Sequence, residues 1–151
     1  MESKLLKNTQ LFGMKHFFNE ITKLHIEKKM PSSIMLSGKK GIGKSTLAYH
    51  LINHFLSKDE EYKYDIKNFI INKDNKSYKL SLNNSHPNFY LINLLSDKKS
   101  IDIKQIREMI TYTKKTTFNN FSRYILIDNI EFLNNNSVNA MLKIIEDSLD
   151  N

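Results

Sequence analysis

The apolar residues of this chain recur at two spacings, one typical of amphipathic helices and the other of buried strands. Helical spacing runs through four stretches, at residues 14–29, 47–56, 103–110 and 138–145. Pro31 ends the first pattern. Asp102 and Gln105 predict a capping box at the start of the helix at residues 103–110. The polar residues 134–137 are predicted to cap the helix at residues 138–145.

Three short apolar runs predict strands, at residues 33–36, 88–94 and 123–128. Strands that alternate with helices are typical of an α/β fold with a parallel sheet. Residues 58–85 are less regular, which predicts a surface insertion with a loose hairpin around the turn-like residues 73–76. Residues 116–122 are predicted to form a polar connection.

Composition narrows the class of protein. The 151 residues suffice for one domain with a core, and no apolar run approaches the roughly 20 residues of a membrane helix. The N-terminus lacks the apolar core of a secretory signal and there is no cysteine, so we expect a cytoplasmic protein without disulfides. The net charge of +7 allows contact with nucleic acid, but it equally fits a solvated basic surface.

Residues 38–46 fit a phosphate-binding loop: Gly, four residues, Gly, Lys, then Ser or Thr. They lie between a predicted strand and a predicted helix, the context that this loop needs. Glycines let successive backbone N–H groups turn around a phosphate, and the helix N-terminus attracts the same anion. We expect Lys44 to reach the β- and γ-phosphates and Ser45 to bind Mg²⁺. The residues expected to bind the nucleotide are Gly38, Gly41, Ile42, Gly43, Lys44, Ser45 and Thr46.

Asp128 ends the third predicted strand, where phosphate-loop nucleotidases place a carboxylate that helps to hold Mg²⁺. Many of these ATPases have Glu directly after that acid, and here the position is Asn129. An amide can hydrogen-bond water but cannot take its proton at neutral pH. Glu131 could substitute only if the backbone turned it inward, and we expect it to face solvent. The sequence therefore predicts a site that binds nucleotide better than it cleaves it.

His50 and His54 are four residues apart on the predicted helix after the loop, a spacing that could place two ligands on one metal ion. No acidic residue joins them in a metal-binding pattern, and cysteine is absent. We therefore interpret them as surface or boundary histidines.

Six segments together resemble one family: residues 10–13, the loop 38–46, His86-Pro87, and residues 103–107, 124–128 and 137–147. The last reads SVNAMLKIIED and is similar to a helix that follows the metal-binding acid in that family. The chain resembles the N-terminal part of the delta-prime subunits of bacterial DNA polymerase III, AAA+ proteins of the clamp loader.

The resemblance implies a three-layer P-loop NTPase (AAA+) fold, in which helices flank a parallel sheet. It implies a subunit that binds ATP and Mg²⁺, hydrolyses ATP weakly or not at all, and helps other clamp-loader subunits to load the sliding clamp onto primed DNA. Many relatives carry a four-cysteine zinc module after the loop helix; here we expect no zinc. The family's sensor-1 strand, lid and collar would follow residue 151, so we expect residues 1–151 to be the N-terminal part of an AAA+ nucleotide-binding domain.

Three alternatives remain open. A tau/gamma-type clamp-loader motor ATPase would normally show Asp-Glu after the strand and a cysteine zinc module, and Asn129 and the lack of cysteine argue against it. A phosphate-loop kinase would need an arginine-rich lid, and no such segment is present. The third alternative is an interaction module whose nucleotide site is idle. A nucleotide titration would distinguish it from a delta-prime-like subunit that binds ATP.

Overall fold

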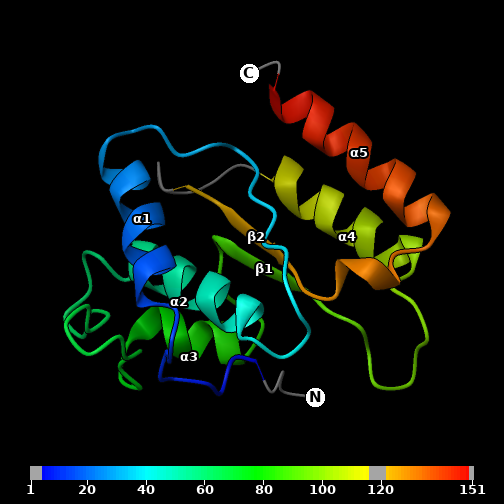
Figure 1. The fold of residues 1–151 in the computed structure, drawn as a ribbon. Coiled ribbons are helices and arrows are strands. Elements are labelled where there is room, and N and C mark those ends of the chain that lie inside the picture. Colours follow the sequence, from blue (N-terminus) through cyan, green and yellow to red (C-terminus); the bar gives the residue numbers. More distant parts are fainter. Residues whose placement is uncertain (1–4, 116–121, 150–151) are drawn as a thin grey trace. The chain divides into compact units, whose positions relative to one another are not determined.

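The computed structural model describes residues 5–115 and 122–149, with side chains through residue 146. They form two units, Met1–His86 and Pro87–Asn151 (Figure 1). The predicted α/β class is confirmed, with helices and a small parallel sheet. Most of the predicted polar connection, residues 116–121, lies outside the described residues.

Unit 1 contains three helices: α1 (Lys15–Ile26), α2 (Lys44–Leu56) and α3 (Lys76–Leu82). The first two form where the apolar spacing predicted them, and α1 packs against α2. Phe18 of α1 is fully buried, and its ring lies 5.3 Å from the ring centroids of both Tyr64 and Phe69. These aromatic contacts join α1 to the segment that follows α2.

The N-terminal segment closes unit 1 by pairing with residues far along the chain. Leu11 N donates to Phe69 O at 3.1 Å, and Ile71 N donates to Thr9 O at 2.9 Å. Gln10 and Ile70 form an isolated antiparallel bridge between these two bonds. The backbone pairing holds the first residues of the chain against a segment about sixty positions away.

The strand predicted at residues 33–36 does not form. The segment is irregular, and Ile34 and Met35 are 45% and 78% exposed. A strand needs a neighbour for its backbone N–H and C=O groups, and none of the described residues forms a ladder with this segment. An apolar run alone was therefore not enough to make the predicted strand.

The hairpin predicted around residues 73–76 is also wrong. Asn75 is the N-cap of α3, and its side-chain oxygen accepts a hydrogen bond from Tyr78 N at 2.7 Å. Residues 58–85 also contribute buried Tyr64, Phe69 and Tyr78 to unit 1, so the segment is not confined to the surface. Whether it is an insertion relative to other members of a family stays a prediction.

Unit 2 is built on two parallel strands, β1 (Phe89–Ile92) and β2 (Tyr124–Ile127), which lie side by side in Figure 1. Both lie inside predicted strands. The helices α4 (Ile103–Lys114) and α5 (Asn135–Leu149) pack against each other, and a short 3-10 helix, η1 (Ile130–Phe132), precedes α5. The buried core of this unit consists of Ile92, Ile101, Ile106 and Met109.

The capping box predicted at the start of α4 is confirmed. Asp102 Oδ1 accepts from Gln105 N at 3.1 Å, and Asp102 N donates to Gln105 Oε1 at 3.4 Å. Gln105 Nε2 also donates to Asn93 O at 3.0 Å, directly after β1. Ser137 is buried and donates from Oγ to Ile101 O at 3.1 Å, which ties the start of α5 to the same region.

The other end of α4 is closed by Arg123, the residue before β2. Its guanidinium donates to the carbonyls of Tyr112, Thr113 and Lys115 at 2.6–2.9 Å. The last carbonyls of a helix have no partner within the helix, so a cation there satisfies their hydrogen bonds and complements the helix dipole. The Arg123 guanidinium carbon also lies 4.8 Å from the centroid of the Tyr112 ring.

His50 of α2 is a fully buried polar residue that joins distant parts of unit 1. Its Nε2 lies 2.9 Å from Asn8 O and its Nδ1 lies 2.9 Å from Tyr64 Oη. A carbonyl can only accept, so Nε2 carries the proton and Nδ1 of the neutral ring accepts from the Tyr64 hydroxyl. Burial lowers the pKa of His50, although the bond to Asn8 opposes that shift.

Replacing Arg123 should destabilise unit 2. We expect Arg123→Met to lower the free energy of unfolding by about 2 kcal/mol, because hydrogen bonds from a charged donor contribute roughly 1.5–3 kcal/mol. Arg107→Met is the matched control, since Arg107 is an exposed arginine within α4 itself. Chemical denaturation measures both; an equal loss in the two variants would contradict the capping role of Arg123.

Acid should destabilise the protein through its buried histidines. Burial lowers the pKa of His50, His54 and His86, so below pH of about 6.5 the unfolded chain binds more protons than the folded one. The stabilisation is therefore complete above that pH and is lost as pH falls towards the folded pKa values. Urea melts between pH 7.5 and 5 should show this loss of stability, and the free energy of unfolding should depend less steeply on pH in His50→Gln than in the wild type. Unfolding that is independent of pH would refute the assignment.

Candidate functional site

The loop of residues 38–46 in unit 1, which the sequence predicts to bind phosphate, folds around the ammonium group of Lys44. Lys44 Nζ donates to Gly38 O at 2.8 Å and to Lys39 O at 2.9 Å. Lys44 is also the first residue of α2, so helix formation and these two bonds fix both ends of its side chain. A phosphate that entered the loop would offer this cation a charged acceptor in place of two neutral carbonyls.

Two glycines show why the loop needs this residue type. Gly43, the residue before α2, has a φ of 96°, which is strained for residues with a side chain. Gly38 has a φ of 150°, which is also strained for residues with a side chain. The loop therefore depends on glycine for its backbone conformation at both ends.

The N-terminus of α2 has the properties of an anion site. Gly43 supplies no side-chain cap, and there is no acidic residue in the first turn. The first N–H groups of a helix have no partner within the helix, and the dipole places partial positive charge there. Together with Lys44, this end of the helix suits a phosphate chemically. Ser45 and Thr46 occupy the first turn and are partly buried.

Asp128 of unit 2 lies at the carboxyl end of β2. Its N–H donates to Ile92 O at 2.8 Å, which extends the parallel ladder by one residue beyond the strand. The side chain is half-buried, and Oδ1 accepts a hydrogen bond from Asn129 N at 3.0 Å. The ladder thus fixes the backbone from which this carboxylate projects.

Asn129 has a left-handed backbone, with φ 58° and ψ 47°. Asparagine tolerates this conformation better than most residues that carry a side chain. Glu131 follows within η1 and is exposed, as the sequence predicted. The position directly after Asp128 thus carries an amide, and its left-handed backbone disfavours the longer side chain of a glutamate.

Lys44 lies in unit 1 and Asp128 in unit 2, so the two halves of the predicted site belong to different units. Each half has a defined local geometry. The carbonyls of Gly38 and Lys39 that hold Lys44 were not predicted. Every residue has a backbone carbonyl, so the sequence does not show which of them will accept a hydrogen bond.

The histidine pair of α2 is engaged in packing. Both ring nitrogens of His50 already have partners in unit 1, and the half-buried ring of His54 packs 5.5–5.6 Å from the rings of Tyr64 and Phe18. Among the described side chains, no group of three or more His, Cys, Asp or Glu could hold a metal ion. The prediction of surface or boundary histidines is therefore wrong for His50, which is fully buried in the core of unit 1, and holds for the half-buried His54.

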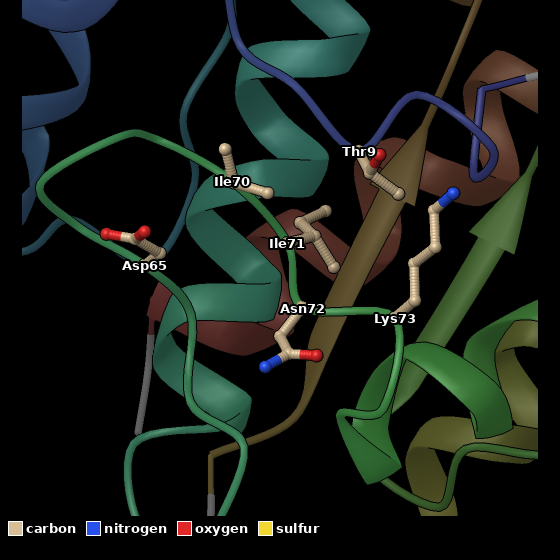
Figure 2. A pocket seen from close by; sticks show the side chains of 6 residues that line it. All are labelled: Thr9, Asp65, Ile70, Ile71, Asn72 and Lys73. Atoms are coloured by element: carbon tan, nitrogen blue, oxygen red, sulfur yellow. The ribbon is translucent and has the colours of Figure 1, made fainter.

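A shallow, open depression of about 380 Å³ lies elsewhere on unit 1, beside the N-terminal segment. In Figure 2, Asp65 and Lys73 lie at opposite ends of it, with Ile70 and Ile71 between them. The Asp65 carboxylate is already bound by Asn68 Nδ2 and by the N–H groups of residues 67 and 68. This depression brings together no group that could carry a reaction.

No helix in residues 5–115 and 122–149 is long and apolar enough to cross a membrane. Comparison with curated proteins gave no match. The sequence model of a family described as "DNA polymerase III, delta subunit" matches residues 13–150, nearly the whole chain. The α/β fold with its small parallel sheet is consistent with an AAA+-like domain. The chain thus belongs to the DNA polymerase III delta subunit family, and its role is related to the clamp loader of DNA replication.

Proposed function

We propose that this protein is an ATP-binding subunit of the clamp loader, of the delta-prime type. The observation that carries the proposal is the loop of residues 38–46, with Lys44 held over it at the uncapped N-terminus of α2. Membership of the family supplies the context of clamp loading. The absence of cysteine and the presence of Asn129 favour the delta-prime type over the motor subunits.

Each polar residue has a distinct part in this proposal. Lys44 leaves the loop carbonyls and binds the β- and γ-phosphates, while the first N–H groups of α2 bind the same anion. Ser45 and Asp128 hold Mg²⁺ through oxygen ligands, the type that Mg²⁺ prefers.

Hydrolysis is slow in this proposal because no side chain stands ready to take a proton from water. Asn129 follows Asp128, its amide cannot act as a base, and Glu131 is exposed. Nucleotide would then serve mainly to organise the subunit within a ring of clamp-loader subunits. That ring would place the sliding clamp on primed DNA.

Removing the ammonium group should weaken nucleotide binding. We expect Lys44→Ala to lose a charge-assisted contact of about 1.5–3 kcal/mol, or roughly tenfold to a hundredfold in the affinity for a fluorescent ATP analogue. Lys40→Ala is the matched control, because Lys40 is exposed in the same loop. Affinity in that control should stay within about fivefold of the wild type, since an exposed charge contributes about 1 kcal/mol or less. Equal affinity in Lys44→Ala and the wild type would refute ATP binding at this loop.

Supplying a carboxylate directly after Asp128 should raise the rate of ATP hydrolysis and lower the stability of the folded protein. General bases contribute about a hundredfold to ten-thousandfold, so even a poorly placed Glu in Asn129→Glu should give measurably faster phosphate release. The left-handed backbone at this position should destabilise the same variant by about 1–2 kcal/mol.

Asn129→Gly is the control for that experiment, because glycine accepts the backbone conformation and adds no base. It should show neither faster phosphate release nor a loss of stability from backbone strain. Rapid steady-state turnover by the unmodified protein would contradict the proposed weak hydrolysis.

A further inference from the structure

The loop of residues 38–46 receives little support from the backbone that leads into it. Of the hydrogen bonds between backbone groups in residues 5–115 and 122–149, none involves residues 30–42. The segment at residues 33–36, just before the loop, is irregular and forms no ladder with the rest of the described chain. The shape of the loop therefore depends on contacts that its own side chains make.

One of these contacts is polar. Lys44 Nζ donates to Gly38 O and Lys39 O, which ties the start of the loop to the first residue of α2. In the proposed function this contact is lost, because the ammonium group turns from two neutral carbonyls to the charged phosphates. The ligand-bound loop therefore cannot rely on it.

The other contact is apolar and is made by Ile42, the one apolar side chain between Gly38 and Lys44. Ile42 Cδ1 lies 2.9 Å from the point where a side chain on Gly38 would place its Cβ, and Lys44 Cδ lies 3.9 Å from the same point. Because glycine has no Cβ, Ile42 packs directly on the backbone at the start of the loop. This contact does not involve the ammonium group of Lys44, so it can persist when that group moves.

The backbone on both sides of Ile42 gives the loop little stiffness of its own. Gly41 and Gly43 flank it, with φ of 86° and 96°. Glycine loses more conformational freedom than any other residue when the chain is fixed, so holding this loop closed is entropically unfavourable. Burial of apolar surface between Ile42 and Gly38 opposes that cost. Since Ile42 is still 47% exposed, its side chain adds little to the core of unit 1.

We propose that Ile42 is a positioning residue that holds the loop in its phosphate-binding shape once Lys44 has moved to the ligand. This inference rests on the proposed function and concerns unit 1 alone. In the free protein, the polar and the apolar contact both close the loop, and in the bound protein only the apolar one remains. A loop without Ile42 can relax while it is empty but must close to bind, so its loss weakens affinity more than stability.

Isothermal titration calorimetry of the full chain with inorganic tripolyphosphate, in the absence of Mg²⁺, tests this role. The probe carries no base or sugar and needs no metal ion, so its binding reports on the loop and not on Asp128. We expect Ile42→Ala to lower the affinity about threefold to tenfold, since each buried CH₂ group contributes roughly a factor of four at room temperature. Ile42→Leu keeps a δ-carbon and should bind within about twofold of the wild type.

Ile34→Ala is the matched control, because Ile34 is 45% exposed and lies in the irregular segment before the loop. It should keep the affinity within about twofold of the wild type, and its urea midpoint should equal that of Ile42→Ala. Equal affinity in Ile42→Ala and Ile34→Ala, or a loss in Ile42→Leu as large as in Ile42→Ala, would overturn the proposal. A lower midpoint in Ile42→Ala would also overturn it, because Ile42 would then support unit 1 as a whole.

Methyl NMR of the free protein separates this inference from the proposed function. The Ile42 δ1 methyl group should show a nuclear Overhauser effect to the α-protons of Gly38, and its absence would overturn the contact whatever the binding data show. Tripolyphosphate binding that is unchanged in Ile42→Ala would refute the role of Ile42 and leave the proposed function intact. A wild type that shows the effect but binds no tripolyphosphate would refute phosphate binding by the loop and, with it, the role of Ile42.

Discussion

The requirement that buried polar groups find hydrogen-bond partners governs how both units are built. Unit 1 has no regular strand among its described residues, so hydrogen bonds from side chains replace much of the backbone pairing that a sheet would provide. His50 joins Asn8 to Tyr64 across two stretches of irregular chain, and Asn53 pairs with Asn75 through reciprocal bonds of 3.3 and 3.4 Å. In unit 2, Arg123 closes α4 in the same way. Each of these groups would be costly to leave unpaired, which gives the fold specific long-range contacts.

The elements that could be predicted from sequence are those whose signal is local. The amphipathic spacing of α1 and α2 and the Asp102–Gln105 capping box of α4 needed only neighbouring residues. Residues 33–36 had the composition of a strand, but a strand depends on a partner that composition does not supply. In α3, seven residues are too few to show a helical period, and Asn75 is as typical of turns as of N-caps.

The same distinction applies to the candidate site. The phosphate-loop pattern specified Lys44 and the positions of its glycines, because the chemistry depends on residue type and spacing. The carbonyl partners of Lys44 and the left-handed backbone of Asn129 are products of folding. The candidate site residues could thus be chosen from the sequence, whereas the groups that position them could not.

The pairing of the N-terminal segment also has a consequence for folding during synthesis. Gln10 donates to the carbonyl of Asn68, 58 positions later, Leu11 N donates to Phe69 O, and Ile71 N donates back to Thr9 O. These first residues leave the ribosome without their partners, and at about 5–20 residues per second they wait roughly 3–12 seconds for them. Contacts of such long range also slow the folding of a complete chain. The N-terminal segment is therefore expected to pair only after α1 and α2 have been synthesised.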